Sequence, residues 1–449
     1  MNNYDWLLSK EAINKSKKYY AHFDYRTDLS TQCEYVSDSQ RVSSHGFYPF
    51  IHYLKKERKY NKSKGKDYKY RDICYSAHID RCIFQYYNYM LNTLYNERVK
   101  KDGINYSAIA YRTDLHKNNI DFAKIAFDYV KAYQSCYVMI GDFTSFFDNL
   151  DHQYLKKQWC SLLGVSSLPE DHYNVFKNIT KYSKFELTDL LKINHLEDTK
   201  QGRRQLNSQS RVLTQEEFKN NKSYIQKNKN SYGIPQGSSI SGLLANIYML
   251  EVDKQIKELV TSFNGLYMRY SDDFIVILPD IAKEVAIDTI SQIRDVFNET
   301  PRLTLQPEKT QYFYYSDRNV SNCGTDFHSG SNCEKKFINF LGFTFDGKVV
   351  SIRSKTTSKY YHRMYRKARN IAKHGGYTRR GNRISCRNLY ERYSIRGAKD
   401  GKGNYFSYIS RASRIFGPSE SVTRDTKRHM QKIRKALKRR INNTNSITQ

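Results

Sequence analysis

Two short apolar runs separated by an acidic pair constrain the fold of this chain more than any other feature of its sequence. The runs are Leu266–Tyr270 and Phe274–Leu278, and only Ser271, Asp272 and Asp273 lie between them. Two strand-like runs joined by so short a polar turn are typical of a β-hairpin. Because a hairpin exposes the side chains of its tip, the pattern predicts a sheet with two carboxylates at one edge. For the acidic pair alone, a simple solvent-exposed turn remains the alternative.

A third acid follows another buried-strand pattern. Tyr137–Ile140 is a compact apolar run that delivers Asp142 at its end, and a helical pattern continues over Ser145–Leu155. Asp142 could instead cap that helix. Phosphodiester synthesis is catalysed by two divalent cations, and Mg²⁺ prefers carboxylate ligands. A strand-end aspartate facing an acidic hairpin tip brings three carboxylates together, so the pattern indicates two-metal nucleotidyl transfer.

The other elements follow in the order of an α+β polymerase palm. A strand at Tyr70–Cys74 precedes a helix that reaches Tyr95, and a strong helix is predicted over Ser239–Leu259. Residues 194–231 are rich in Lys, Asn and Gln without periodicity, so we expect a loop or flap there. We predict three domains: a basic helical extension over 1–66, fingers and palm over 67–345 with the polar insertion 194–231, and a basic helical thumb over 346–449.

The charge of the chain predicts a polyanionic partner. The net charge is +30, and residues 351–449 contribute +23 of it through 27 Lys or Arg against 4 Asp or Glu. Basic residues that meet phosphates release condensed counterions, so this region is predicted to clamp RNA. A merely solvated basic face is the alternative. The candidate RNA contacts are Arg363, Arg366, Lys367, Arg369, Arg434, Lys435, Lys438 and Arg439.

Composition also restricts the location of the protein. No apolar run reaches the roughly 18 residues that a membrane helix needs, and the first residues lack a signal-peptide core. We therefore expect a cytoplasmic protein without membrane contact. The 8 cysteines form no CxxC pair, so reduced thiols are expected. Cys323, His328 and Cys333 could bind a metal ion, but a fourth ligand is missing.

Six motifs in this order resemble those of reverse transcriptases. Three surround the acids and a Pro-Gly turn: Asp142-Phe143-Thr144-Ser145-Phe146-Phe147, Pro235-Gln236-Gly237-Ser238 and Tyr270-Ser271-Asp272-Asp273. The others are Lys69-Tyr70-Arg71 with Asp80-Arg81 and Gln85, Pro307-Glu308-Lys309-Thr310, and Phe340-Leu341-Gly342. The resemblance covers about residues 65–345. It implies a right-hand polymerase with fingers and palm of the reverse transcriptase type, followed by a thumb-like helical domain.

The resemblance implies catalytic roles for the matching residues. Asp142 and Asp272 would bind two Mg²⁺ ions, with Mn²⁺ as an alternative, while Asp273 assists and the Phe143 carbonyl completes the metal sphere. Lys309 would protonate the leaving pyrophosphate, although a surface lysine is equally consistent with the sequence. Phe340, Leu341 and Gly342 would form the primer grip.

The resemblance also implies which residues bind the incoming deoxynucleoside triphosphate. Phe147 falls at the family's steric-gate position, where a ring collides with a ribose 2′-hydroxyl; the neighbouring Phe146 is the better candidate for a core residue. At that site Gln236 would contact the sugar or the template base. Gly237 would let the backbone come close, although a plain turn needs the same glycine.

The fingers motif supplies the predicted triphosphate ligands. Arg71 would hold the triphosphate with its bidentate fork, with Lys69 or Lys66 nearby. A solvated basic loop is the alternative for these residues.

Further phrases resemble bacterial defence-associated reverse transcriptases of the retron and abortive-infection groups. They are His78-Ile79-Asp80, Ala110-Tyr111-Arg112 and the run from Gly237 to Tyr248. This implies antiphage defence, a noncoding RNA encoded nearby as template, and a DNA product. The alternatives are a template-independent or protein-primed DNA polymerase of the same fold, an RNA-dependent RNA polymerase, and a catalytically idle RNA-binding scaffold.

Overall fold

The chain divides into two compact units that each consist of three segments. The computed structural model describes residues 3–61, 65–328, 336–372, 376–377, 381–384, 386–398, 403–418, 420–426 and 428–445. The first unit comprises residues 1–114, 143–258 and 292–305, and the second comprises 115–142, 259–291 and 306–449. Two helices, α14 (Leu250–Thr261) and α15 (Lys283–Glu299), carry the chain from one unit to the other.

The first unit is mainly helical and contains one four-stranded sheet with the order β2-β1-β4-β5. Its strands are β1 (Phe50–Asn61), β2 (Gly65–Tyr75), β4 (Ser183–Glu186) and β5 (Gln226–Lys227). Its helices are α1 (Asn3–Leu7), α2 (Lys10–Ser16), α3 (Leu29–Ser37), α4 (Ser39–Ser43), α5 (His78–Lys101), α7 (Phe146–Asn149), α8 (His152–Leu163), α9 (Glu170–Thr180), α10 (Leu187–Ile193), α11 (Lys200–Ser208), α12 (Gln215–Asn220) and α13 (Ser241–Tyr248), with a 3-10 turn at Lys222–Tyr224.

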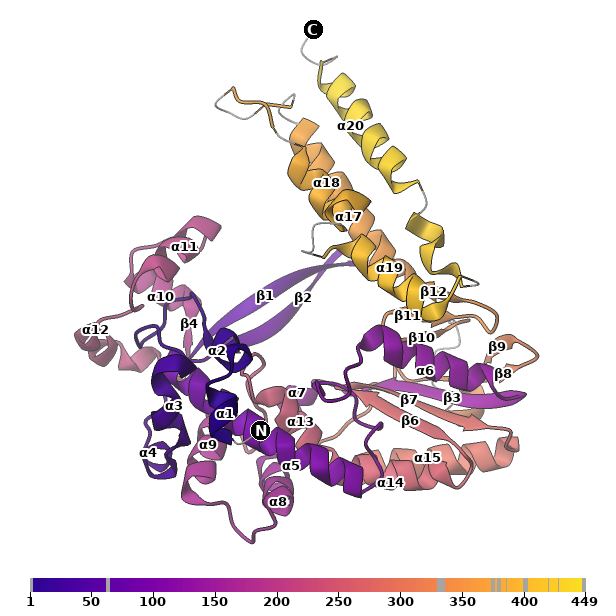
Figure 1. Cartoon of the computed structure of the whole chain (residues 1–449), viewed down its shortest axis with the longest axis horizontal. Helices are drawn as coiled ribbons and strands as arrows, with labels where there is room; N and C mark the ends of the chain where they lie inside the picture. The colour runs from indigo at the N-terminus through magenta and orange to yellow at the C-terminus, as the bar shows by residue number, and fades with distance from the viewer. Residues whose placement is uncertain are drawn as a thin grey trace. The chain divides into compact units, whose positions relative to one another are not determined.

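A long antiparallel hairpin of β1 and β2 corrects one sequence prediction. Residues 50–61 lie in the predicted helical extension, yet they form a strand paired with β2 from Ile51↔Tyr75 to Asn61↔Gly65 (Figure 1). Their run of Lys and Arg gives no strand signal in the sequence. The strand is instead held extended by hydrogen bonds to its partner strand, which do not depend on its side chains. The predicted domain boundary at residue 66 falls at the start of β2 and therefore separates two paired strands.

The polar insertion is also not a loop. Residues 194–231 contain α11, α12 and β5, so the prediction of a loop or flap without regular structure was wrong. Thr199 caps α11 by accepting from the Gly202 N–H, and Thr214 forms a capping box with Glu217 at α12. A few apolar side chains anchor the segment in a core cluster shared with Phe185: Leu206, Val212 and Leu213.

The helix predicted over Ser239–Leu259 is two helices. The break lies at Met249, between α13 and α14. Seven of the eight residues of α13 are buried, including the small Ser241 and Ala245. A helix that is apolar on all sides must be enclosed by its neighbours, so α13 forms part of the interior of the first unit.

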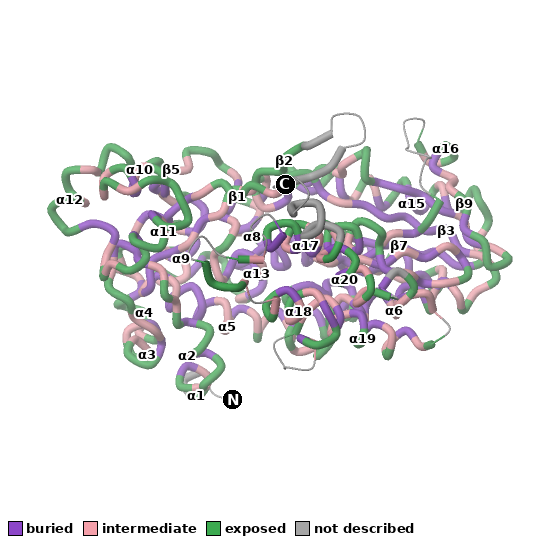
Figure 2. Tube along the Cα trace, turned by 90° about the horizontal axis from the view of Figure 1, so that it is seen from above, coloured by how far each residue is buried: buried purple, intermediate pink, exposed green. Residues whose placement is uncertain are grey.

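The second unit is built on a five-stranded antiparallel sheet with the order β6-β7-β3-β8-β9. The central strand β3 is buried at all six positions between its first and last residues (Figure 2). Because successive strand side chains point to opposite faces, both faces of the sheet are covered. The strands are β3 (Ser135–Asp142), β6 (Leu266–Tyr270), β7 (Asp273–Pro279), β8 (Gln311–Ser316) and β9 (Asn319–Asn322), accompanied by the helices α6 (Asn119–Lys131) and α16 (Gly324–Phe327).

The C-terminal part of the second unit is a small sheet followed by helices. A core cluster of Met364, Ile371, Leu389 and Ile433 joins three of these helices, α17, α18 and α20. No helix in the described part of the chain is long and apolar enough to cross a membrane. The elements are β10 (Ile338–Phe340), β11 (Phe343–Phe345), β12 (Val350–Ile352), α17 (Ser354–Ala372), α18 (Arg387–Tyr393), α19 (Tyr405–Phe416) and α20 (His429–Asn445), with 3-10 turns at Ile395–Ala398 and Ser421–Thr426.

A fully buried histidine in the first unit makes stability depend on pH. The ring of His22 is solvent-inaccessible and its Nε2 lies 3.2 Å from the Tyr75 carbonyl oxygen. Burial lowers the pKa of His22 from 6.5 to about 3. Between these values the unfolded chain binds a proton that the folded chain does not. The free energy of unfolding therefore falls as pH falls, by up to about 1.4 kcal/mol per pH unit.

We predict that the free energy of unfolding of the His22→Gln variant falls less steeply as the pH is lowered. Between pH 7 and pH 5 the variant should lose about 2 kcal/mol less of its free energy of unfolding than the unmodified chain, as measured by urea denaturation. The control is His362→Gln, because His362 is exposed on α17. Equal losses in the His22 variant and the unmodified chain would contradict the prediction.

Candidate active site and nucleotide-binding elements

Two of the three predicted catalytic carboxylates face each other across neighbouring strands. Asp142 is the last residue of β3 and is the register partner of Asp273, the first residue of β7. Tyr270 is the other register partner of Asp273, so Ser271 and Asp272 form the two-residue tip of the β6–β7 hairpin. Ser271 has a φ of 62°, which such a tight turn requires. The sheet therefore brings Asp142, Asp272 and Asp273 to one edge, as the sequence predicted.

A buried arginine that sequence reasoning missed supports the hairpin tip. Arg269 is fully buried, and its Nη1 donates to the Ser271 carbonyl oxygen at 3.0 Å. An arginine in an otherwise apolar strand pattern is unusual, because a charged side chain is seldom buried without a partner. This was the sequence signal that could have identified Arg269. Its bond holds the backbone of the turn that carries Asp272.

A glycine fixes how closely β3 and β7 pack beside the acids. Gly141 is the register partner of Phe274, and a Cβ built on it would lie 2.4 Å from Cζ of the Phe274 ring. Phe274 is fully buried and its ring has no room to move aside. Only glycine at position 141 therefore allows this ring to lie over the strand next to Asp142.

Lys309 is bonded to the carboxylate cluster. Its Nζ donates to Oδ2 of Asp142 at 2.6 Å. The same segment is held by its backbone, because the Gln306 N–H donates to the Asp142 carbonyl at 2.9 Å and the Lys309 N–H donates to Gln306. The ammonium group of Lys309 thus neutralises part of the negative charge at this edge of the sheet.

Burial and the neighbouring acids raise the pKa of two of the carboxylates, Asp272 and Asp273. The pKa of Asp272 is raised by desolvation and then by the charge of Asp142. The pKa of Asp273 is raised to about 6, first by desolvation among the crowded strand ends and then by the charges of Asp272 and Asp142. Carboxylates that repel one another at short range are relieved by a bound cation, so this donor set fits hard divalent ions.

The carboxylates of Asp142, Asp272 and Asp273 do not form a complete metal site as they lie. Among the residues that the structure describes, no three His, Cys, Asp or Glu side chains are close enough together to hold an ion as they lie. One carboxylate of the set, Asp142, is bonded to Lys309 instead. Phe143, whose carbonyl was predicted as a further ligand, has its side chain buried against Phe146 and Phe297.

The first unit contains the predicted nucleotide-binding turn. Gly237 has a φ of 115°, and a Cβ there would lie 2.4 Å from the Cys74 carbonyl oxygen. The Gln236 carbonyl accepts from the Cys74 N–H at 2.8 Å, so the turn is docked on the end of β2. The positive φ and the close backbone contact explain why this position is glycine.

Phe147 belongs to the same local structure. Its carbonyl accepts from the Ile234 N–H at 2.9 Å, one residue before Pro235 of the predicted turn. Phe147 is half-buried, whereas Phe146 is 4% exposed and packs in the core. This division agrees with the prediction that Phe146 is the core residue of the pair.

The predicted triphosphate ligands lie on the β1–β2 hairpin. Arg71 is 41% exposed and its Nη1 pairs with Oε2 of Glu57 at 2.7 Å, so a bound triphosphate would have to compete with this carboxylate. Lys69 is exposed and is the register partner of Glu57. Both residues therefore lie on one stretch of the hairpin. The side chain of Lys66 lies outside the described residues.

The predicted primer grip is the turn between β10 and β11. Leu341 and Gly342 have φ values of 47° and 92°, as in a two-residue hairpin turn that favours glycine or asparagine. Neighbouring elements hold this turn: the Leu341 carbonyl accepts from Nδ2 of Asn119 at 3.0 Å, and the same Nδ2 donates to the Tyr408 hydroxyl at 3.1 Å. A bulky leucine at a positive φ is strained, which these contacts offset.

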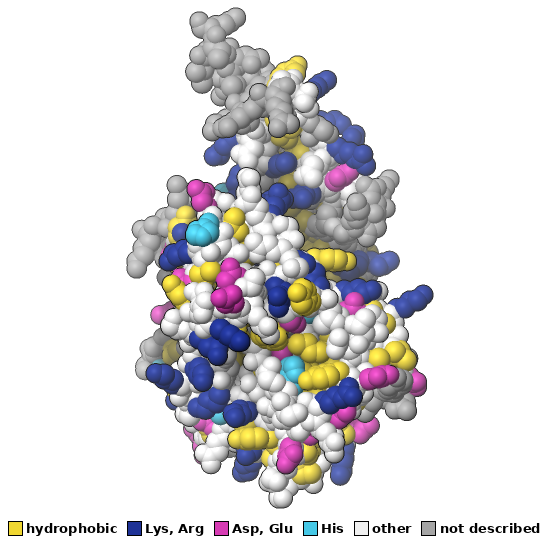
Figure 3. Space-filling model, turned by 90° about the vertical axis from the view of Figure 1, so that its left-hand side faces the viewer, with side chains coloured by type: hydrophobic (Ala, Val, Ile, Leu, Met, Phe, Trp, Pro, Cys, Tyr) yellow, Lys and Arg dark blue, Asp and Glu magenta, His cyan; other side chains and the backbone are white. Residues whose placement is uncertain are grey.

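The predicted RNA contacts lie on two helices of the second unit. Except for the partly buried Lys367, those whose side chains are described are exposed. The side chain of Arg439 lies outside the described residues. On the face drawn in Figure 3, Lys and Arg cover more of the surface than Asp and Glu. The residues are Arg363, Arg366, Lys367 and Arg369 on α17, and Arg434, Lys435 and Lys438 on α20.

This sheet and its acids define the palm of a right-hand polymerase. The chain belongs to the reverse transcriptase (RNA-dependent DNA polymerase) family, whose model matches residues 61–345. No curated protein gives a significant match to the sequence.

Several solved telomerase structures give weak matches to this chain. A truncated apo telomerase from Candida tropicalis is 12% identical with a TM-score of 0.40, and the match covers 73% of this chain and 61% of that one. The apo telomerase from the same organism is 13% identical with a TM-score of 0.39, covering 94% and 73%. A Candida albicans telomerase with a TWJ fragment of telomeric RNA is 13% identical with a TM-score of 0.38, covering 92% and 68%. These values concern the fold alone.

We predict that Gly141→Ala destabilises the palm sheet. The added methyl group would collide with the buried Phe274 ring, and such overpacking typically costs about 1–3 kcal/mol. A thermal melt should therefore show a lower midpoint for this variant. The matched control is Gly46→Ala, because nothing lies within 4 Å of a Cβ at Gly46. If the two variants melt alike, the tight β3–β7 contact is refuted.

Proposed function

We propose that this protein is an RNA-directed DNA polymerase that copies an RNA template into DNA by two-metal-ion nucleotidyl transfer. One observation carries the proposal: Asp142 ends the central strand of the palm sheet opposite Asp273, with Asp272 beside it at the hairpin tip. In a chain of the reverse transcriptase family, this is the set of carboxylates that the reaction needs.

The carboxylates would hold Mg²⁺ ions. Asp142 and Asp272 would bind both ions, Asp273 would assist, and the Phe143 carbonyl would complete the sphere. The bound ions would supply charge neutralisation at the phosphorus and activation of the primer 3′-hydroxyl. The mutual repulsion of Asp142, Asp272 and Asp273 supports this assignment, because it raises the affinity of the edge for cations.

The ion pair of Lys309 with Asp142 suggests a role for this lysine in the reaction. Its ammonium group is bonded to Asp142 and is 46% exposed. It can offset the carboxylate repulsion in the free enzyme. When cations take over that role, the ammonium group would be released to donate a proton or a hydrogen bond to the departing pyrophosphate.

The nucleotide would be selected by residues of the first unit. The half-buried ring of Phe147 would exclude a ribose 2′-hydroxyl, while Gln236 would contact the sugar or the template base. Arg71 and Lys69 would bind the triphosphate, with Glu57 exchanged for phosphate oxygens at Arg71.

The proposal includes the template of the polymerase and its biological role. The template would be a noncoding RNA encoded nearby, and the exposed basic residues of α17 and α20 would bind it. A role in antiphage defence rests on the sequence phrases that resemble bacterial defence-associated enzymes, and we propose a cytoplasmic location on the sequence expectations given above. Sequencing of the RNA and DNA that copurify with the protein tests the template assignment.

We predict that Asp272→Asn combined with Asp273→Asn abolishes DNA synthesis while RNA affinity changes less than about twofold. The substitutions remove the ion ligands, whereas the predicted RNA contacts lie on other elements. Primer extension with deoxynucleotides and RNA binding by fluorescence anisotropy measure the two effects. The control is Asp317→Asn: Ser316 pairs with Ser135, so Asp317 follows β8 at the end of the sheet opposite Asp142.

Full extension by the double variant would refute the palm assignment. No extension by the unmodified chain on any primed RNA or DNA template would favour the idle RNA-binding scaffold instead. Extension without a template would favour the template-independent polymerase.

A second prediction concerns sugar selection. Phe147→Ala should raise ribonucleotide incorporation relative to deoxynucleotide incorporation by about tenfold or more, because removing the ring opens space for the 2′-hydroxyl. Single-nucleotide extension with each substrate measures the ratio. Phe146→Ala is the control, expected to destabilise the fold without changing the ratio, since Phe146 packs on Phe143 at 5.6 Å between ring centroids. An unchanged ratio for the Phe147 variant would exclude Phe147 as the gate.

A further inference from the structure

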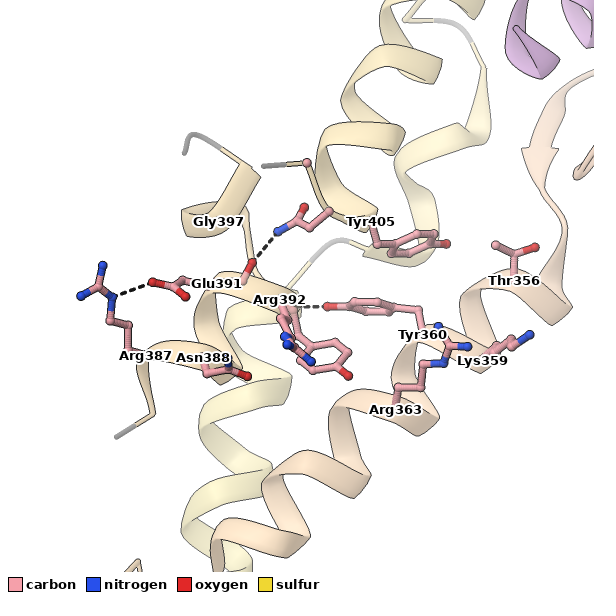
Figure 4. Close-up of a pocket in the computed structure, with 13 residues that line it drawn as sticks. Thr356, Lys359, Tyr360, Arg363, Arg387, Asn388, Glu391, Arg392, Gly397 and Tyr405 are labelled. Atoms are coloured by element: carbon pink, nitrogen blue, oxygen red, sulfur yellow. Dashed lines mark hydrogen bonds and ion pairs between the residues drawn. The ribbon is translucent and has the colours of Figure 1, made fainter. Parts of the chain in front are cut away.

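A cavity of about 810 Å³ lies within the C-terminal helices of the second unit (Figure 4). Thr356, Lys359, Tyr360 and Arg363 line one wall from α17, and their spacing of three or four residues places them on one face of that helix. The other walls come from α18, from the 3-10 turn after it and from the start of α19. Its volume lies in the range of small-ligand sites, about 300–1,000 Å³.

The aromatic wall of the cavity is rigid. The Tyr360 hydroxyl donates to the Tyr393 carbonyl oxygen at 2.6 Å, and the Tyr360 ring stacks on Tyr405 with centroids 4.5 Å apart and planes 26° apart. The Tyr405 hydroxyl lies 2.9 Å from Oγ1 of Thr357. Tyr393 and Tyr405 are half-buried, so their rings can offer a fixed apolar surface to a ligand.

A polar anchor holds the far side of the cavity. Nδ2 of Asn404 donates to the Glu391 carbonyl at 2.9 Å and to the Ser394 carbonyl at 2.8 Å. These bonds join the start of α19 to the end of α18. The shape of the cavity is therefore fixed before any ligand binds, which reduces the entropy that binding costs.

The charge of the cavity is strongly positive. Of its four cations, Arg387 pairs with Oε1 of Glu391 at 2.6 Å. Lys359, Arg363 and Arg392 are exposed and form no ion pair with any residue in the described part of the chain. Three positive charges therefore remain available beside the tyrosine rings.

We propose that this cavity binds one nucleotide of a single-stranded RNA, with its base against the tyrosines and its phosphate on Arg363 and Arg392. Aromatic rings stack on any base, and guanidinium groups bind phosphate with paired hydrogen bonds. An acidic peptide would use the cations but would leave the aromatic surface without a flat partner. The inference rests on the proposed function in taking RNA as the ligand, and it adds a defined site to the general basic surface of α17 and α20.

The test compares two charge-matched double variants of the full chain. Arg363→Gln with Arg392→Gln alters the cavity, whereas Arg366→Gln with Arg369→Gln removes the same charge from exposed positions of α17 outside it. Binding of a fluorescent single-stranded RNA of about 10 nucleotides is measured by anisotropy across a salt series. We expect the cavity variant to lose about tenfold or more in affinity and to lose more than the control. Its salt slope should be flatter by about 0.7 units, because the contact with one phosphate is lost.

Competition identifies the ligand chemistry. Adenosine monophosphate should displace the RNA from the unmodified chain at lower concentration than inorganic phosphate does, because only the nucleotide has a base to stack. The cavity variant should lose this difference. Equal affinity losses in the two variants would overturn the proposal. So would phosphate or polyglutamate that competes as well as the nucleotide.

Primer extension by the unmodified chain separates this inference from the proposed function. Specific RNA binding in the cavity by a chain that cannot extend any primer would remove the polymerase proposal and leave the nucleotide site intact. Normal extension together with equal losses in the two variants would remove the nucleotide site and leave the polymerase proposal intact.

Discussion

The register of β3 against β7 is the constraint on which the candidate active site depends. Side chains alternate between the faces of a strand, so a shift of one residue would turn Asp142 away from Asp273 and move six buried side chains to the wrong faces. The contact between Gly141 and Phe274 opposes such a shift, because β3 has no other glycine over which the Phe274 ring could lie so closely. The contact between Gly141 and Phe274 thus helps to keep Asp142 beside Asp273.

The same edge of the sheet carries an electrostatic cost. Desolvation and mutual repulsion raise the pKa of Asp272 and Asp273, so the folded protein holds these carboxylates in an unfavourable state. Lys309 limits that cost, because its positive charge opposes the rise in the pKa of both carboxylates. A group of carboxylates that repel one another is stabilised when a cation binds. Perturbed pKa values of this kind are common at the functional sites of proteins.

The sequence was sufficient to predict the hairpin, the strand before Asp142 and the family, because each depends on local patterns of apolar and turn residues. It was insufficient for β1 and for residues 194–231. The strand β1 is held by pairing with β2, and α11 is held by Leu206 in a distant cluster, so neither has a strong local signal. The bond between Lys309 and Asp142 joins residues 167 positions apart in the chain, and no pattern in the sequence predicts it.

The position of β3 at the centre of its sheet has a consequence for biosynthesis. Both of its neighbours, β7 and β8, are translated long after it, since they begin at Asp273 and Gln311. Until the ribosome has delivered them, the apolar run Tyr137–Ile140 has no strand to pair with and exposes both edges to other chains. The first unit is likewise incomplete until its last segment, residues 292–305, has been made. The order of the elements therefore favours aggregation of the unfinished chain, independently of how stable the finished protein is.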